Sequence, residues 1–156
     1  MSMSSNTVSS QWGDVFQAIE TCYDLGWTDG LPVIPPTVER VSQFLEHIKA
    51  DGSEILGEIP ERRRQINIEK ATANAVMAGC LPEYFPVVLT AIEAILEPEF
   101  NLHGITASTM GAAVLTVITG PIVTTLDLNG GISLFGPGHR ANATICLLYT
   151  SDAADE

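Results

Sequence analysis

The feature that most constrains the fold is an apolar, β-branched run in the last third of the chain, Ala-Ala-Val-Leu-Thr-Val-Ile-Thr at residues 112–119. A run of this kind without polar alternation is typical of a strand buried on both faces of its sheet. Gly120-Pro121 interrupts it, and residues 122–126 and 132–135 predict further short strands on either side of a turn at residues 129–131. The last third is therefore expected to form a buried, β-rich segment.

The residues before this run have helical periodicity. Residues 11–25 carry large apolar side chains at helical spacing, among them Trp12, Phe16 and Tyr23, which predicts an amphipathic helix. A proline-containing stretch follows, and Thr37 is well placed to cap a second helix that reaches about Ala50. The N-terminal part is therefore expected to be helical.

A helical hairpin is expected in the middle of the chain. Asn67 is a suitable N-cap for a third helix, and Gly79 is the residue type that ends one. Pro82 begins a fourth helix at a position where proline is tolerated, and Pro98 ends it. Because the link between the two helices is short, they are expected to lie antiparallel or sharply bent.

The sequence as a whole predicts an α/β or α+β domain over residues 11–145, with a polar leader at residues 1–10. A glycine-rich loop at residues 136–140 leads into a helix that begins near Ala141. Residues 146–156 resemble a translated sequencing-adapter tail, so the helix and the domain are expected to be truncated there. The alternative interpretation of this segment is an ordinary acidic C-terminus, and a truncated chain that folds incompletely is a further alternative.

Composition favours a packed protein with an anionic surface. Hydrophobic residues make up 46% of the chain and charged residues 17%, which argues against a disordered segment. The net charge of −12 would repel a nucleic acid, and the basic run at residues 62–64 is too short to offset it. A nucleic acid is therefore not an expected partner.

The expected location is the cytoplasm, without membrane insertion. Residues 1–10 lack the features of a secretory signal, and no apolar stretch approaches the roughly 20 residues of a membrane helix. The three cysteines lie far apart, which is typical of thiols in a reducing compartment. The three histidines are also scattered, so no metal site is predicted, and no cofactor can be named.

Cys80 is the first candidate for a catalytic role. It precedes Pro82, where the positive end of the following helix would favour a thiolate suited to nucleophilic or redox chemistry. The alternative is a small buried side chain that fills a tight helix junction.

The loop Gly136-Pro-Gly-His-Arg-Ala-Asn142 is the second candidate. Backbone N–H groups of Gly136 and Gly138, together with the side chains of Arg140 and Asn142, could bind a carboxylate or phosphate. Pro137 removes one N–H group, which argues against a dinucleotide-binding loop. A purely structural turn is the alternative.

Two further residues complete the expected site. His103 could move protons near neutral pH, although a histidine beside a glycine is also typical of a hydrogen-bonded loop. Asp29 could bind substrate, or it could simply form the turn before Gly30.

Three strings in the chain resemble a bacterial family associated with UGSC-type (seleno)proteins, distant relatives of the selenoprotein B of betaine and glycine reductases. The strings cover residues 23–37, 75–84 and 135–145, and the likeness extends over residues 12–145. This resemblance implies thiol- or selenol-based reduction of a small molecule, with the chain as companion to a redox-active partner. The UGSC motif itself is absent, so the resemblance carries over no redox pair of residues.

Two functions are therefore expected as alternatives. In the first, the chain is an enzyme domain for thiol-dependent reduction of a small anionic substrate, in which Cys80 and His103 are catalytic and the other candidates bind substrate. In the second, it is a non-catalytic ligand-binding or accessory subunit, in which Cys80 only packs. The reactivity of the Cys80 thiol discriminates between them.

Overall fold

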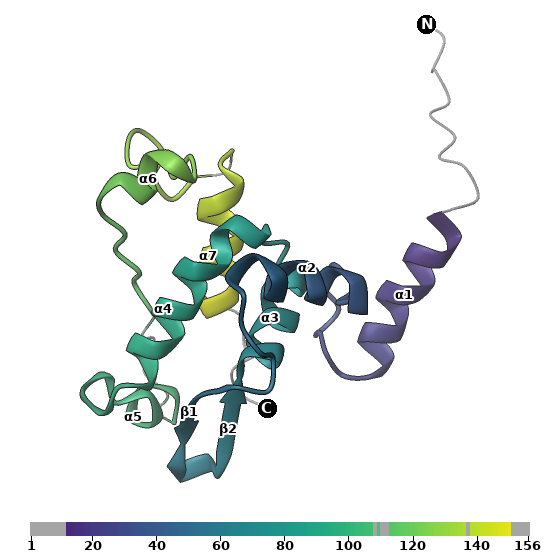
Figure 1. Cartoon of the computed structure of the whole chain (residues 1–156), viewed down its shortest axis with the longest axis horizontal. Helices are drawn as coiled ribbons and strands as arrows, with labels where there is room; N and C mark the ends of the chain where they lie inside the picture. The colour runs from purple at the N-terminus through teal and green to yellow at the C-terminus, as the bar shows by residue number, and fades with distance from the viewer. Residues whose placement is uncertain (1–11, 108, 110–112, 137, 151–156) are drawn as a thin grey trace, which may run out of the picture.

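The computed structural model describes residues 12–107, 109, 113–136 and 138–150 (Figure 1). The α-helices are α1 (Trp12–Asp24), α2 (Val38–Ile48), α3 (Ile68–Met77), α4 (Phe85–Leu96), α5 (Leu102–Thr106), α6 (Pro121–Thr125) and α7 (Arg140–Thr150). The strands are β1 (Ile55–Ile59) and β2 (Arg64–Asn67), and the single 3₁₀ turns are η1 (Pro60–Arg62), η2 (Pro82–Tyr84) and η3 (Pro98–Phe100). This mixed composition confirms the predicted α/β class. None of the described helices is long and apolar enough to cross a bilayer.

The predicted helix starts at Thr37 and Asn67 are confirmed. Thr37 has extended backbone angles, and its Oγ1 accepts a hydrogen bond from the Arg40 N–H at 3.4 Å. Asn67 is also extended, and its Oδ1 accepts from the Lys70 N–H at 2.9 Å. Each cap satisfies a backbone donor that the first helical turn leaves unpaired, so the local sequence fixes where α2 and α3 begin.

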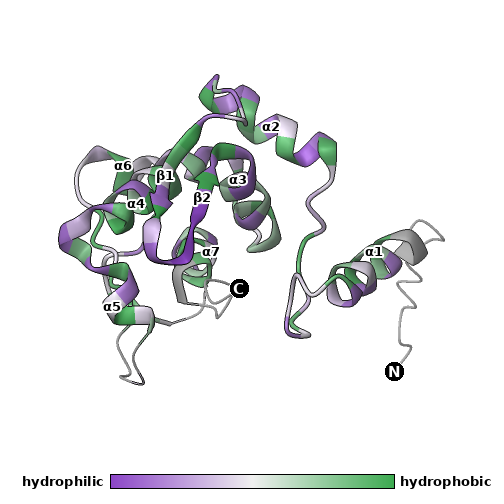
Figure 2. Ribbon diagram, turned by 90° about the horizontal axis from the view of Figure 1, so that it is seen from below, coloured by the Kyte–Doolittle hydropathy of each residue, from purple (hydrophilic) through white to green (hydrophobic). Residues whose placement is uncertain are grey.

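The core lies among α2, α3, α4 and α7. Phe85 at the start of α4 is fully buried, and its ring meets that of Phe44 from α2 edge-on, with centroids 5.4 Å apart. Ala75 on α3 and Ile145 on α7 belong to the same cluster. The small side chains of Ala71 and Ala75 on α3 are buried in this cluster, in agreement with the packing contacts expected of the helical hairpin. By contrast, α1 lies apart from the other helices in Figures 1 and 2.

The predicted buried strand at residues 112–119 is wrong. Residues 113–119 are not in a strand, and Leu115 and Val117 are 72% and 76% exposed. β-branched residues favour an extended backbone, but a strand also requires a neighbouring edge with which to pair. Among the described residues, β1 and β2 pair only with each other, so residues 113–119 pair with no strand.

The two shorter strands expected after this run are also wrong. Residues 121–125 form helix α6, because Pro121 occupies the first helical turn and Gly120, at φ +94°, turns the chain into it. Residues 132–135 form a turn, in which Ile132 and Phe135 are 98% and 89% exposed. The predicted strands of the last third are therefore absent among the described residues, although the predicted α/β class of the whole fold is correct.

The strands lie instead in a stretch that the sequence analysis left unassigned. β1 and β2 form an antiparallel hairpin in which Glu58 pairs with Gln65 and Ile59 with Arg64. The connection is η1, and Arg63 closes it in the left-handed region at φ +51°, donating its N–H to the Pro60 carbonyl at 3.1 Å. The hairpin leads directly into the Asn67 cap of α3.

Helix α7 begins where the sequence predicted a helix and continues through residue 150. The expected domain boundary after residue 145 therefore lies within a continuous helix. Leu148, beyond that boundary, packs against the core.

Candidate functional site

The chain reverses direction between α3 and α4 through a Schellman motif. The Gly79 N–H donates to the Val76 carbonyl at 2.9 Å, and the Cys80 N–H donates to the Ala75 carbonyl at 3.0 Å. Gly79 has φ +84°, a conformation that glycine adopts without a steric penalty. The motif ends α3 and places Cys80 at the position where a helix end usually buries a small apolar side chain.

Arg140, the first residue of α7, lies against this reversal. Its Nε and Nη2 both donate to the Gly79 carbonyl, at 3.1 Å and 2.9 Å. The guanidinium therefore sits at the carbonyl end of α3, where the helix dipole favours a positive charge. These two hydrogen bonds join α7 to the C-terminal end of α3.

Cys80 is 6% exposed and belongs to the core cluster. Burial raises the pKa of the Cys80 thiol above its ordinary value, while a hydrogen bond with Thr144 and the positive charge of Arg140 act in the opposite direction. Burial outweighs both, so the net shift of the Cys80 pKa is upward. The thiolate expected from the position before η2 is therefore not favoured.

The glycine-rich loop is held by its own hydrogen bonds. The Gly136 N–H donates to the Ser133 carbonyl at 2.7 Å, and Gly138 has φ +126°. The Asn142 side chain accepts from the Asn129 N–H at 2.8 Å and donates to the Asn129 carbonyl at 3.0 Å. Asn142 thus secures Asn129 to α7, a structural role that sequence reasoning missed. Pro137 lies outside the described residues.

Asp29 and His103 are not brought to Cys80. Asp29 Oδ1 accepts from the Leu31 N–H at 3.3 Å, which is the turn-forming alternative. His103 is exposed on α5, beyond the far end of α4 from Cys80. Helix α4 is about 18 Å long at 1.5 Å per residue, and Figure 1 shows α5 at its C-terminal end. Of the four residues expected to form one site, the structure brings together Cys80 and Arg140.

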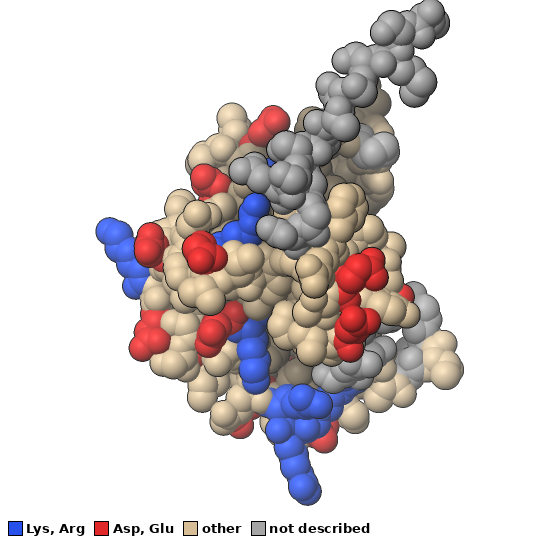
Figure 3. Space-filling model, turned by 90° about the vertical axis from the view of Figure 1, so that its right-hand side faces the viewer, with Lys and Arg blue, Asp and Glu red and all other residues tan. Residues whose placement is uncertain are grey.

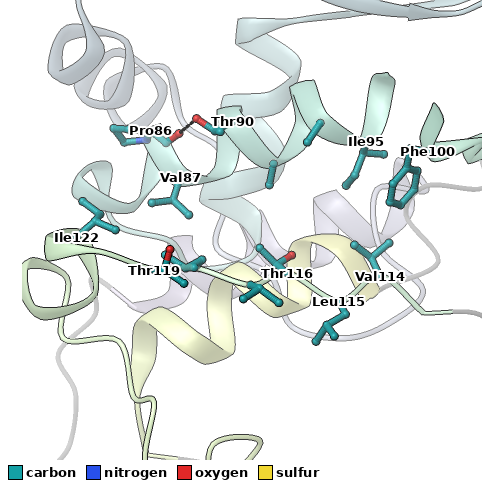
Figure 4. Close-up of a pocket in the computed structure, with 14 residues that line it drawn as sticks. Pro86, Val87, Thr90, Ile95, Phe100, Val114, Leu115, Thr116, Thr119 and Ile122 are labelled. Carbon is teal, nitrogen blue, oxygen red and sulfur yellow. Dashed lines mark hydrogen bonds between the residues drawn. The ribbon is translucent and has the colours of Figure 1, made fainter. Parts of the chain in front are cut away.

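A cleft of about 580 Å³ lies between α4 and the extended segment at residues 114–119 (Figure 4). Figure 4 shows Val87 of α4 opposite Thr119 of the extended segment, across the cleft. Its few hydroxyl groups come from threonines, and Thr90 Oγ1 already donates to the Pro86 carbonyl at 3.0 Å. The lining residues are Pro86, Val87, Thr90, Ala91, Ala94, Ile95, Phe100, Val114, Leu115, Thr116, Val117, Ile118, Thr119 and Ile122.

This cleft is not among the predicted sites, although the sequence of α4 contains a signal for it. Val88 is fully buried against α3, and Ile92 packs against the same core. Val87, Ala91 and Ala94 recur at helical spacing on an adjoining face, which faces the cleft. A helix that is apolar on two adjoining faces is expected to have a second partner besides the core.

No family model matches this chain, and searches of curated proteins and of solved structures also find no match. Within the described part of the chain, no group of three or more His, Cys, Asp or Glu side chains is placed to hold a metal ion.

Proposed function

We propose that this chain is a small-ligand-binding or accessory domain whose ligand occupies the cleft between α4 and residues 114–119. The observation that carries the proposal is the cleft itself, an open volume of about 580 Å³ lined almost wholly by apolar side chains. Cleft volumes of about 300–1,000 Å³ are typical of small-molecule sites. Cys80 and Arg140 pack the helix junction in this proposal and take no part in chemistry.

The lining predicts the class of ligand. No described lining residue is charged, and the polar groups are the hydroxyls of Thr90, Thr116 and Thr119. A charged ligand would lose its hydration without gaining a countercharge. An uncharged, largely apolar molecule would instead gain about 25 cal/mol for each Å² of apolar surface removed from water. The proposed ligand is therefore an apolar small molecule.

A neutral fluorescent probe, N-phenyl-1-naphthylamine, tests the proposal. Replacing Ala91 by leucine adds three carbons to the wall of the cleft, so Ala91→Leu is expected to weaken probe binding at least about fivefold. Ala18→Leu on α1 adds the same carbons away from the cleft and is expected to leave binding unchanged. Equal affinities for the Ala91→Leu and unsubstituted proteins would contradict the proposal. Circular dichroism verifies that both variants fold.

Thiol-dependent reduction of a small molecule, with a UGSC-type redox partner, is the second candidate. The observation that favours it is that Thr144 and Arg140 both lower the pKa of the Cys80 thiol against the effect of burial. Access to the buried sulfur would then require the junction to open. Rapid alkylation of Cys80 in the folded protein at neutral pH would favour this candidate over the binding domain.

A further inference from the structure

The few basic side chains of this acidic chain are not spread evenly. Arg62, Arg63, Arg64 and Lys70 are four of its seven Lys and Arg residues, and they fall within nine positions of the sequence. In the structure these positions are the β1–β2 connection, β2 and the first turn of α3. Figure 3 shows blue side chains gathered at the hairpin end of the molecule. A local positive patch therefore interrupts a surface whose net charge is −12.

Three of these side chains line one groove of about 630 Å³, together with Glu58, Ile59, Pro60 and Gln65. The register of the hairpin explains the grouping, because Ile59 and Arg64 are directly paired across the two strands. Arg63 turns the chain beside them, and Lys70 follows on α3. All residues that line the groove therefore come from one short segment of the chain, residues 58–70, which contains the end of β1, the whole of β2 and the start of α3.

The three cations in the groove are not neutralised within the described structure. Arg63, Arg64 and Lys70 form no ion pair with another described residue. The one acidic residue in the lining, Glu58, accepts a hydrogen bond from Gln65 Nε2 at 2.6 Å. Arg62 is used differently, since its Nη2 donates to Thr106 Oγ1 at 3.0 Å and ties the hairpin to α5.

We propose that this groove binds a compact, multiply charged oxyanion such as the phosphate groups of a small molecule. Guanidinium groups match oxyanions in geometry and donate two parallel hydrogen bonds, and a lysine adds a mobile point charge. A ligand of groove size meets the three cations, whereas a longer polyanion extends over the acidic surface and is repelled. The ligand is therefore a small anion and not a nucleic acid. The groove shares no residue with the apolar cleft, so this inference is independent of that site.

Calorimetric titration with inorganic pyrophosphate at low salt tests the inference. The unsubstituted protein is expected to bind, with an affinity that falls as salt is added. The double variant Arg63→Gln/Arg64→Gln is expected to bind at least about tenfold more weakly. Arg40→Gln, which removes one positive charge from α2, serves as the control and is expected to change affinity less than twofold. Lys70→Gln gives an independent test if the double variant does not fold.

Three results would overturn the inference. The first is the absence of binding at millimolar pyrophosphate. The second is an equal loss of affinity in the Arg40→Gln control and in the groove variants, which would indicate a general charge effect. The third is tighter binding of a 20-nucleotide oligothymidine than of pyrophosphate, which would indicate an extended polyanion as the ligand.

Discussion

Two regions of this molecule are rich in apolar residues, and they differ in how those residues are covered. In the helical core, Phe85 and Val88 are fully buried. In the segments at residues 113–119 and 132–135, Val117 is 76% exposed and Phe135 is 89% exposed. The helices bury their apolar faces against one another, while residues 113–119 lack a paired strand among the described residues and residues 132–135 form an exposed turn. Apolar composition alone therefore does not determine burial, because an extended segment also needs a partner for its backbone.

The largest expected difference between a buried and an exposed side chain is in thiol reactivity. Cys80 lies in the core and Cys146 is exposed on α7. In a Cys22→Ser variant at neutral pH, we expect Cys80 to react with iodoacetamide at least about 100-fold more slowly than Cys146, because the core must open first. Mass spectrometry of timed samples measures both rates. Comparable rates would contradict the burial of Cys80.

The contribution of the Cys80 thiol to the stability of the fold depends on pH in a definite direction. Since burial raises the pKa of Cys80 in the folded protein, its protonated form stabilises the fold. This contribution is fully present below the unfolded pKa of about 8.5 and is lost as the pH rises through the folded pKa. Replacing Cys80 by alanine is expected to reduce this loss of stability at alkaline pH.

Substitution of aromatic residues is expected to give the next largest contrast. Phe85→Ala removes a fully buried ring and should lower the free energy of unfolding by about 3–5 kcal/mol. Phe135→Ala removes an exposed ring and should change it by less than about 0.5 kcal/mol. Urea denaturation followed by circular dichroism measures both values. Similar losses would show that residues 132–135 are covered in solution.

The smallest expected effect concerns the helix caps. Asn67→Ala removes a 2.9 Å hydrogen bond at the start of α3 and should cost about 1 kcal/mol. Thr37→Ala removes a longer bond of 3.4 Å at the start of α2 and should cost less. The same urea denaturation measures the difference. A larger loss for Thr37→Ala would contradict the order that these distances predict.

These contrasts also explain which parts of the fold were predictable. The starts of α2 and α3 depend on Thr37 and Asn67, whose hydrogen bonds reach only three residues along the chain. Such contacts are encoded locally, so the sequence predicts them. Strand pairing is not local, and residues 112–119 predicted an extended conformation without specifying a neighbouring strand. Pro121 gave a local signal for helix α6 that the β-branched residues after it obscured.

In the candidate site, too, local contacts could be predicted from the sequence and contacts between distant residues could not. The expected role of Asp29 as a turn former follows from its neighbours, and the structure shows that turn. The contact of Arg140 with Gly79 joins residues 61 positions apart, so no sequence pattern contains it. The sequence predicts a small anionic ligand at Arg140 and the glycine loop. The groove proposed above for an oxyanion is lined instead by Arg63, Arg64 and Lys70, two of which belong to the short basic run at residues 62–64.

The two hydrogen bonds from Arg140 to the Gly79 carbonyl have a consequence for the order of folding. Helices α2, α3 and α4 are neighbours in sequence and can associate early, whereas α7 must close a loop of about 60 residues to reach them. Closing such a loop costs roughly 1.5 kcal/mol more entropy than closing one of 10 residues. On a growing chain, Gly79 is synthesised long before Arg140. We therefore expect the thiol of Cys80 to remain accessible to solvent until α7 docks.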